Sequence, residues 1–546
     1  MRSPRLPALA AFLCVAGLAH AASFEDRVET LFRPLLAEMM ALSPDGQRVA
    51  YTSPSGRELR IVILPLEPPG ARRTITVELP RDAPGATPVT SAALRFLRWA
   101  TAERLVYAPA ERIVPLPPEV DADGRPVPNP NGPTILAPIM AADADGRQRG
   151  TLVDAKDFQE TSEDARRTLA DLLRTTKELQ RTRPEPVRWR MPHLDILGFL
   201  PSDREQLIVG TRGAYSFPAQ HLVDIRTGTV RGFGGDWTPP PGEPHVFDWF
   251  RLKVVGERQP AARPTTHWQD DDLARVQREL EQKFPRRTVE IADWSDSRAR
   301  VLFRVTGGSD PGRVFLYQRP ENLVLEILRR APWLSAAALN DTRPFEFTAA
   351  DGAQLSGQLT WPAKPRVEPP PLVVVFPSGP PGRAHPAFDP EAELLADQGF
   401  VVARLNHRSM AGGRNDDPSR SRAALDRPAL DDAQHAIDWL AARHSSRPFD
   451  VRRVAALGHG IGGALALRAR QQKPATFHCG VAIDAATDLD VRRQAHERPA
   501  AVLALDPGLA QADLAARVAA YRAIDAFLGR HLHAGVPRTG SAEETK

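Results

Sequence analysis

The pattern of hydrophobic and polar positions changes near residue 345 and divides the chain into two parts. From residue 22 to 345, short apolar runs typical of strands recur between turns such as Ser43-Pro44-Asp45-Gly46, which precedes the run at 48–51. Asp-Gly is a strong turn signal because glycine tolerates a positive φ angle. This irregular repetition predicts a β-propeller of about seven blades with about 40–45 residues each. An array of β-sandwiches is the alternative.

Two helical insertions interrupt the propeller-like part. Residues 161–180 predict one helix, in which Thr161 and Asp164 form a capping box. Asp270, Asp271 and Asp272 open a second helix that extends to residue 283. Three adjacent acids are compatible with a metal site, but carboxylates at a helix N-terminus are stabilised by the helix macrodipole, and we favour this second role.

From residue 346 to 546, long apolar strands alternate with helices. Continuous apolar strands separated by helices indicate a parallel sheet that is covered on both faces. We therefore expect a doubly wound, mostly parallel sheet, with strands at 372–376, 401–405, 454–457, 479–483 and 501–505 and helices at 430–443, 463–472 and 514–531.

The first 21 residues have the features of an export signal. Arg2 and Arg5 precede an apolar run at 6–18, and Ala19-His20-Ala21 supplies the small-x-small pattern that precedes cleavage. The run is too short to span a bilayer as a stable helix, and no later segment is apolar enough to be transmembrane. We expect cleavage near Ala21 and a periplasmic or secreted protein without a membrane span.

Composition and charge exclude some partners and cofactors. The 71 basic and 67 acidic residues give a formal charge of +4, and the basic residues, almost all arginines, are scattered among the acids. A nucleic-acid-binding protein concentrates them on one face, so we expect no nucleic-acid partner. The sequence has no zinc-ligand spacing and no phosphate-binding loop after a strand, so we expect no cofactor. Cys479 is the one cysteine of the mature chain, and we expect it to be buried in a strand.

Residues 454–463 carry the clearest chemical pattern in the chain. A strand at 454–457 runs into Gly458-His459-Gly460-Ile461-Gly462, and a helix follows. A strand, a sharp turn and a helix, with glycines two positions before and after a central residue, form the layout of the nucleophile elbow G-x-S-x-G. The flanking glycines let the backbones pack closely, and the central residue has a strained backbone. Here the central residue is Gly460, so the turn can persist although the nucleophile is absent.

With this elbow, the chain resembles the prolyl oligopeptidase family of serine peptidases over nearly all of its mature length. Asp351-Gly352 with Leu355-Ser356-Gly357 is similar to the segment that opens the peptidase domain of the family, and Asp431-Asp432 with Trp439-Leu440 is similar to the helix before its elbow. The resemblance implies a β-propeller at 22–345 followed by an α/β-hydrolase domain at 346–546 that is shortened at its C-terminal end.

The departures from this family fall at its catalytic positions. Near the oxyanion hole the family has His-Gly-Gly-Pro, whereas this chain has Pro377-Ser378-Gly379-Pro380. The segment Asn406-His407-Arg408-Ser409 lacks the tyrosine that donates to the oxyanion in some members. Asp506 matches the position of the catalytic acid, but no histidine lies between it and the final helix, where the family has its base. His459 adjoins the elbow, and we expect its side chain to point beside the site.

These losses favour a pseudoenzyme, because a serine hydrolase needs a nucleophile, a base and an acid that orients the base. We expect a catalytically inactive protein that binds peptides or an exported protein. An active serine peptidase or esterase with a rearranged catalytic set is the alternative. A third hypothesis is a propeller that binds partners while the C-terminal domain is only a structural support.

Overall fold

The structure is a computed structural model, and the placement of most of the chain after residue 22 is described. The described residues are 23–55, 58–67, 70–77, 94–110, 112–114, 119–120, 126–127, 134–147, 149–158, 193–212, 219–234, 245–259, 263–377, 388–406, 422–484, 502–505, 509 and 513–533. The predicted signal peptide and the predicted helix at 161–180 lie outside them. Within the described part, no helix is long and apolar enough to cross a membrane.

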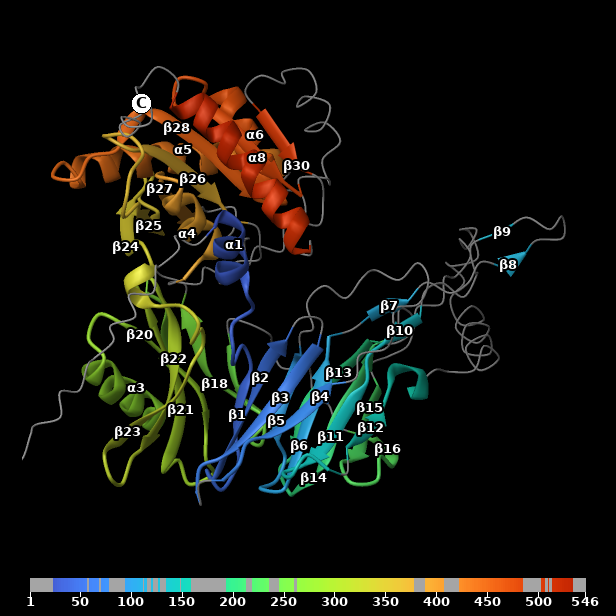
Figure 1. The fold of residues 1–546 in the computed structure, drawn as a ribbon. Coiled ribbons are helices and arrows are strands. Elements are labelled where there is room, and N and C mark those ends of the chain that lie inside the picture. The colour runs from blue at the N-terminus through green and yellow to red at the C-terminus, as the bar shows by residue number, and fades with distance from the viewer. Residues whose placement is uncertain are drawn as a thin grey trace, which may run out of the picture.

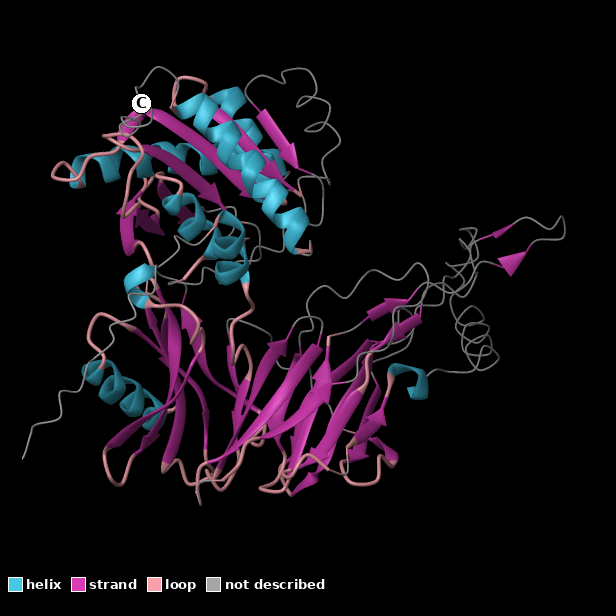
Figure 2. Ribbon diagram, in the orientation of Figure 1, coloured by secondary structure: helices cyan, strands magenta, loops and turns pink. Residues whose placement is uncertain are grey.

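Antiparallel sheets build the N-terminal part of the molecule in a propeller-like arrangement (Figures 1 and 2). The described residues form five such sheets, four of them with four strands and one with three. Their strands are β1 (Met40–Leu42), β2 (Arg48–Ser55), β3 (Glu58–Pro65) and β4 (Arg73–Val77); β5 (Leu94–Trp99), β6 (Arg104–Pro109), β11 (Ile139–Asp143) and β12 (Gly150–Val153); β13 (His193–Leu200), β14 (Asp203–Arg212), β15 (Ala219–Asp224) and β16 (Val230–Phe233); β17 (His245–Asp248), β18 (Lys253–Gln259) and β19 (Thr265–Trp268); and β20 (Thr288–Trp294), β21 (Arg300–Gly307), β22 (Asp310–Gln318) and β23 (Leu323–Arg329).

The propeller-like arrangement agrees with the sequence, but the predicted number of seven blades is not confirmed. One reason is that a sheet together with its connections can take up more residues than the about 40–45 per blade that we expected. Between β6 and β11 the chain forms two small strand pairs before it returns to the second sheet, namely β7 (Arg112–Val114) with β10 (Thr134–Leu136), and β8 (Glu119–Val120) with β9 (Pro126–Val127). A connection of this length is not visible as such in the spacing of apolar runs.

The predicted turn at Ser43-Pro44-Asp45-Gly46 joins β1 to β2. The Gly46 amide donates to the Ser43 carbonyl at 2.7 Å, and Gly46 has a φ angle of 74°. A side chain at Gly46 would also meet the Arg300 side chain of the fifth sheet, with a Cβ placed 2.7 Å from its Cδ. This turn therefore needs glycine both for its backbone angle and for the close contact between two sheets.

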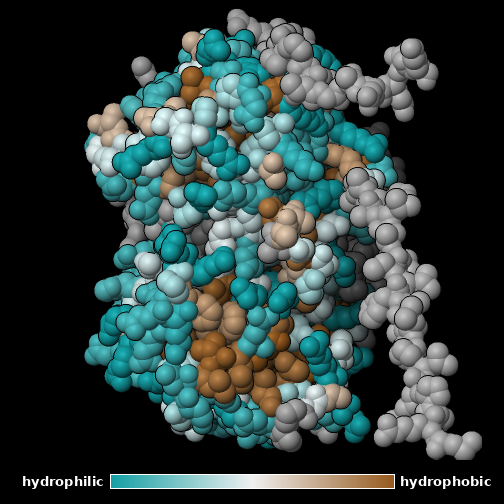
Figure 3. All heavy atoms as spheres, turned by 60° about the vertical axis from the view of Figure 1, so that its left-hand side comes forward, coloured by the Kyte–Doolittle hydropathy of each residue, from teal (hydrophilic) through white to brown (hydrophobic). Residues whose placement is uncertain are grey.

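The outer edge of the fifth sheet is apolar. Leu323 and Leu325 of β23 are 43% and 39% exposed, and β23 pairs only with β22. Apolar side chains gather on this side of the propeller-like part (Figure 3). Single exposed leucines are common on soluble proteins, but a gathered patch is an interaction surface in many of them.

One mixed sheet forms the centre of the C-terminal domain, with the strand order β24-β25-β27-β26-β28-β29-β30. The pairs among β24, β25 and β27 are antiparallel and the other four pairs are parallel. The strands are β24 (Asp341–Thr348), β25 (Gln354–Trp361), β26 (Pro371–Phe376), β27 (Val401–Asn406), β28 (Asp450–His459), β29 (Phe477–Ile483) and β30 (Val502–Leu505). The helices are α4 (Pro390–Asp397), α5 (Arg422–Arg443), α6 (Ile461–Gln472) and α8 (Leu514–Leu532).

Alternate side chains of the central strand β26 face two separate hydrophobic cores. Leu372, Val374 and Phe376 pack in the core that contains residues of α5 and α6. Val373 and Val375 pack in the core that contains residues of α4 and α8. The sheet is therefore mostly parallel and buried on both faces. Whether it is doubly wound depends also on connections such as 407–421 and 485–501, which lie outside the described residues.

The first helix, α1 (Phe24–Phe32), packs on the C-terminal domain although it precedes the first sheet (Figure 1). Arg27 forms an ion pair with Asp397 of α4 at 2.6 Å. The ring of Phe32 lies 5.0 Å from that of Tyr521 of α8. The sequence analysis assigned these residues to the propeller-like segment 22–345 and predicted no helix there. The packing of α1 links that segment to both α4 and α8.

Candidate functional site

The elbow at Gly460 has the backbone geometry of a sharp strand-to-helix turn. Strand β28 ends at His459 and α6 begins at Ile461, so Gly460 is the N-cap residue of the helix. Its φ and ψ angles are 52° and −115°. Its amide donates to the carbonyl of Ile483 at 2.8 Å, which ties the turn to β29. A residue with a Cβ is strained in this conformation, whereas glycine is not.

The two flanking glycines are required by close backbone contacts. A Cβ added to Gly458 would lie 2.2 Å from the carbonyl oxygen of Gly462. A Cβ added to Gly462 would lie 2.0 Å from the carbonyl oxygen of Phe376, at the end of β26. The helix can therefore begin directly against the neighbouring strand only because both positions lack side chains. The strand, turn and helix thus have the layout of a nucleophile elbow without its nucleophile.

His459 is bound to a buried carboxylate behind the elbow. Its Nε2 lies 2.9 and 3.0 Å from the two carboxylate oxygens of Glu391, which is in the first turn of α4. The hydroxyl of Tyr521, on α8, donates to Oε1 of Glu391 at 3.0 Å. Sequence reasoning placed His459 beside the elbow but did not find these two partners. They lie 68 and 62 positions away from it, and neither residue belongs to a recognisable motif.

The charge of His459 follows from this pairing. Burial lowers its pKa, but the negative charges of Glu391, Asp389 and Asp484 outweigh burial and raise the pKa to about 9. Burial and the same Glu391 carboxylate raise the pKa of Tyr521 well above its usual value. His459 is therefore an imidazolium at neutral pH. An imidazolium that is already protonated cannot take a proton from a nucleophile, so His459 is a positioning and charge-pairing residue.

The other predicted site residues are only partly within the described chain. Asn406 ends β27, and its Nδ2 donates to the Ser356 hydroxyl at 2.9 Å. Ser378, Gly379, Arg408 and Asp506 lie outside the described residues. The structure therefore brings together Gly458, His459, Gly460, Ile461 and Gly462 in one turn, and ties Asn406 to β25.

Cys479 is a buried structural residue on β29. Its side chain lies in the core under α4 and α8, as the sequence predicted. Burial raises the pKa of its thiol to about 12. A thiol with so high a pKa is not ionised at neutral pH, so Cys479 is not a candidate nucleophile.

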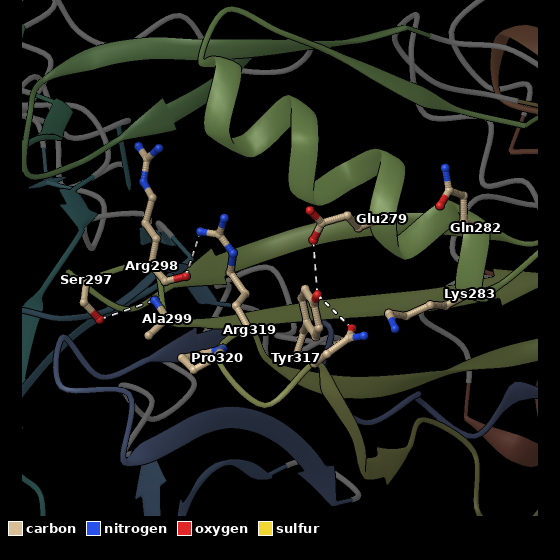
Figure 4. A pocket seen from close by; sticks show the side chains of 10 residues that line it. Glu279, Gln282, Lys283, Ser297, Arg298, Ala299, Tyr317, Arg319 and Pro320 are labelled. Atoms are coloured by element: carbon tan, nitrogen blue, oxygen red, sulfur yellow. Dashed lines mark hydrogen bonds between the residues drawn. The ribbon is translucent and has the colours of Figure 1, made fainter.

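A pocket of about 730 Å³ lies far from the elbow, where helix α3 (Asp271–Lys283) packs beside β22 of the fifth sheet (Figure 4). The Tyr317 hydroxyl lies within hydrogen-bond distance of a Glu279 carboxylate oxygen and of the Asn322 side chain, both at 3.1 Å, in this pocket. Its arginines are already paired: Arg298 with Asp270 at 2.6 Å and Arg319 with Asp272 at 2.9 Å.

Two of the three consecutive acids at the start of α3, Asp270 and Asp272, have structural roles. Asp270 caps the helix by accepting the amides of Asp272 and Leu273 at 3.1 and 3.2 Å. The Arg298 guanidinium holds the pKa of Asp270 at about 2, because it binds the carboxylate directly. The cap and the two arginine pairs favour the helix-start role over the metal site.

Comparison with known proteins relates the C-terminal domain to one family. Residues 386–504 match the profile of the prolyl oligopeptidase family, and this segment contains the elbow and the Glu391–His459 pair. The protein "Dipeptidyl peptidase family member 6" of Caenorhabditis elegans is 23% identical over 221 residues, which are 36% of this chain and 29% of that protein. The match therefore spans less than a third of the length of that relative.

Solved structures that match this chain include peptidases. The acylaminoacyl peptidase of Pyrococcus horikoshii is 14% identical, with a TM-score of 0.39 over 82% of this chain and 69% of that chain. A puromycin-hydrolyzing peptidase of Mycobacterium tuberculosis is 17% identical, with a TM-score of 0.38 over 93% of this chain and 80% of that chain. Because both TM-scores are below 0.5, we take nothing about activity from them.

Proposed function

Because this chain is related to the prolyl oligopeptidase family of serine peptidases, we propose that it is a catalytically inactive relative that is retained to bind peptides or an exported protein. The observation that carries this proposal is Gly460, which occupies the nucleophile position of an otherwise preserved elbow. The flanking glycines and the helix start remain, so the turn is kept while the group that would attack a carbonyl is absent. The alternatives are an active hydrolase with a rearranged catalytic set and a propeller that binds partners while the C-terminal domain is only a support.

The nearest histidine does not restore the chemistry. A general base must be unprotonated and within hydrogen-bond reach of the nucleophile. His459 uses Nε2 to bind Glu391, and its raised pKa of about 9 keeps it charged at neutral pH. The pair of His459 and Glu391 is also the one observation that favours the alternative, an active hydrolase with a rearranged catalytic set. In that case a serine outside the described residues, Ser378 or Ser409, would have to act with it.

The export and the finer architecture belong to the same proposal. The Ala19-His20-Ala21 pattern supports cleavage near Ala21 and a periplasmic or secreted location. The spacing of short apolar runs favours about seven blades, whereas the described residues form five antiparallel sheets of three or four strands in this part. The alternation of strands and helices supports a doubly wound sheet. An experimental structure of the mature chain tests both features, and the mass of the exported chain tests the cleavage site.

A serine-directed fluorophosphonate should not label the full-length protein. We expect intact-mass spectra without the phosphonate adduct after an incubation that fully labels an active serine peptidase run in parallel. The reason is the loss of the nucleophile from the elbow and of the histidine base expected before the final helix. A stoichiometric adduct mapped to any residue of 347–546 would show that a rearranged catalytic set exists.

Substituting serine for Gly460 tests the elbow directly. Gly460→Ser should lower the free energy of unfolding by about 1–3 kcal/mol, because serine has a Cβ at a φ angle of 52°. It should not produce ester hydrolysis, since among the described residues the histidine next to the elbow, His459, is charged and bound to Glu391. Chemical denaturation and a chromogenic ester assay measure the two effects. Turnover well above that of the parent would reveal a base, and unchanged stability would refute the strained turn.

A further inference from the structure

A second cavity, of about 790 Å³, lies along the axis of the propeller-like part. It is lined by residues of the first strands β5, β17 and β20, by Met39 just before β1, and by the turns that follow β13, β17 and β20. Strand β1 contacts both β5 and β20, so these first strands surround a common axis. The cavity is separate from the elbow and has the volume of a site for a small ligand or a short peptide end.

The lining of this cavity is basic. Five arginines and three aspartates line it. The aspartates are already satisfied: Asp296 pairs with Arg204 at 2.6 Å, and Asp248 pairs with Arg251 at 3.2 Å. Asp293 accepts the amides of Leu42 and Trp294, at 2.8 and 3.0 Å. The lining therefore has more positive charge than its own carboxylates neutralise.

Arg98 is the cation with the clearest capacity for a ligand. Its Nη1 donates to the carbonyls of Leu97 and Met40, at 2.9 and 3.3 Å, which fixes the guanidinium at the cavity wall. Within the described part of the chain, no carboxylate lies within ion-pair distance of Arg98. Burial raises the pKa of Asp293 and the Arg98 charge opposes that rise, so Arg98 already acts on this buried carboxylate from beyond direct contact. A guanidinium offers five N–H donors in a planar fork that fits a carboxylate, and the donors of Arg98 that no carboxylate contacts directly are available to an anionic ligand.

Aromatic rings complete the wall. Phe247 and Trp249 meet edge to face at 5.1 Å, and Trp249 also meets Phe96 edge to face at 5.0 Å. Phe250 stacks on Phe199 with ring centroids 5.0 Å apart. Phe247, Trp249 and Phe250 line the cavity together with Trp294. Rings that are held by neighbouring rings offer rigid faces to an aromatic or apolar group at a low entropic cost.

One ion pair joins the far sides of the cavity. Arg204 lies at the start of β14, in the third sheet, and Asp296 lies in the turn after β20, in the fifth sheet. Between them, the Arg204 guanidinium stacks over the ring of Phe250 at 4.4 Å. Arg204 thus connects elements of three sheets at the cavity wall.

We propose that this cavity binds the carboxyl-terminal end of a peptide, with the carboxylate on Arg98 and an aromatic or apolar last side chain against Trp249 and Trp294. This inference rests on the proposed peptide-binding function and names the group that is recognised. Fixed positive charge beside rigid aromatic faces matches a ligand that has both a carboxylate and an apolar body. A neutral amide end would not pair with the Arg98 charge and should bind more weakly.

The test uses the full-length protein with two small probes that differ in one group. N-acetyl-L-phenylalanine has the carboxylate, and N-acetyl-L-phenylalaninamide is its neutral counterpart. We expect isothermal titration calorimetry at low salt to show saturable binding of the acid and at least about tenfold weaker binding of the amide. Added sodium chloride should weaken binding of the acid and leave binding of the amide unchanged.

Two variants locate the site. Arg98→Met should reduce the affinity for the acid to that for the amide. Arg60→Met should leave both affinities unchanged, because Arg60 is an exposed residue whose carboxylate partner is Glu58 on the same strand. If Arg98→Met does not fold, the acid-to-amide ratio and the salt dependence of the parent protein still decide the matter. Equal affinities for acid and amide, or binding of neither probe, would overturn the inference.

Failure of this inference can be told apart from failure of the proposed function. Phosphonate labelling would contradict the inactive state whatever the probes do. An unlabelled protein that binds neither probe would contradict the carboxylate site and leave the inactive state standing. Selective binding of the acid that persists unchanged in Arg98→Met would show that the carboxylate is bound elsewhere, and would also overturn the inference.

Discussion

Replacing Gly462 by alanine is expected to unfold the C-terminal domain. The added Cβ would lie 2.0 Å from the carbonyl oxygen of Phe376 and 3.0 Å from that of Pro377, and both are backbone atoms. Backbone cannot move aside as a flexible side chain can, so α6 would have to shift away from β26. Overpacking of this kind costs several kcal/mol, at or above about 3 kcal/mol. That is a large fraction of the stability of a domain, which is about 5–15 kcal/mol.

A matched substitution on the last helix gives the control. Gly529 lies inside α8, and a Cβ built on it meets nothing within 4 Å. Gly529→Ala should therefore stabilise the protein by about 1 kcal/mol, because alanine is the better helix former. Denaturant titrations followed by circular dichroism compare the two variants. If Gly462→Ala unfolds at the same midpoint as the parent, the close contact between helix and strand is not present in solution.

The C-terminal domain should lose stability as the pH rises from about 6.5 to 9. The folded pKa of His459 is about 9 and its usual value is 6.5. A group whose folded pKa is raised contributes its full stabilisation below the unfolded pKa and loses it as the pH passes the folded pKa. The difference corresponds to a loss on the order of 3 kcal/mol. Thermal or denaturant unfolding measured in steps between pH 6 and pH 9.5 follows this loss.

Variants on two histidines assign this pH dependence. His459→Gln should remove the slope between pH 6.5 and 9 and lower the stability at pH 6, because Glu391 then loses its charged partner. Glu391→Gln should remove the same slope. His435→Gln, on α5, should keep it. A slope that survives in His459→Gln would mean that another group titrates with folding.

A buried carboxylate extends the pH dependence to lower values. Burial raises the pKa of Glu393, on α4, to about 7, although the amide of Asn340 donates to its Oε2 at 2.8 Å. Ionising this buried group is unfavourable, so stability should fall between about pH 4.5 and 7, in the same direction as for His459. Glu393→Gln should remove this lower part of the slope and leave the upper part. The two groups can therefore be measured separately.

The sequence was sufficient for the elements that depend on local pattern. The apolar runs at 372–376 and 401–405 correspond to β26 and β27, and the glycines around His459 marked the end of β28 and the start of α6. The helix expected at 430–443 begins at Arg422, eight positions earlier, and contains Pro428. Element boundaries of this kind depend on packing that periodicity does not report.

Features that join distant residues could not be predicted in the same way. Glu391, His459 and Tyr521 come from two helices and one strand, α4, β28 and α8, and no spacing in the chain marks them as partners. The position of α1 on the C-terminal domain is also set by tertiary contacts, since its apolar residues Val28 and Leu31 pack under α8. The number of sheets depends on connections whose length varies freely. Local patterns identify elements, whereas these features depend on which elements meet.

The position of α1 has a consequence for how the chain folds during synthesis. Helix α1 packs against both α4 and α8, and Arg522 of α8 forms an ion pair with Glu25 at 2.9 Å. Domains generally fold in order from the N-terminus as the chain emerges. Here α4 follows α1 in the chain and α8 comes later still, so the contacts of α1 are complete only when α8 is in place. A variant that lacks α8 would therefore leave Val28 and Leu31 of α1 without part of their apolar cover.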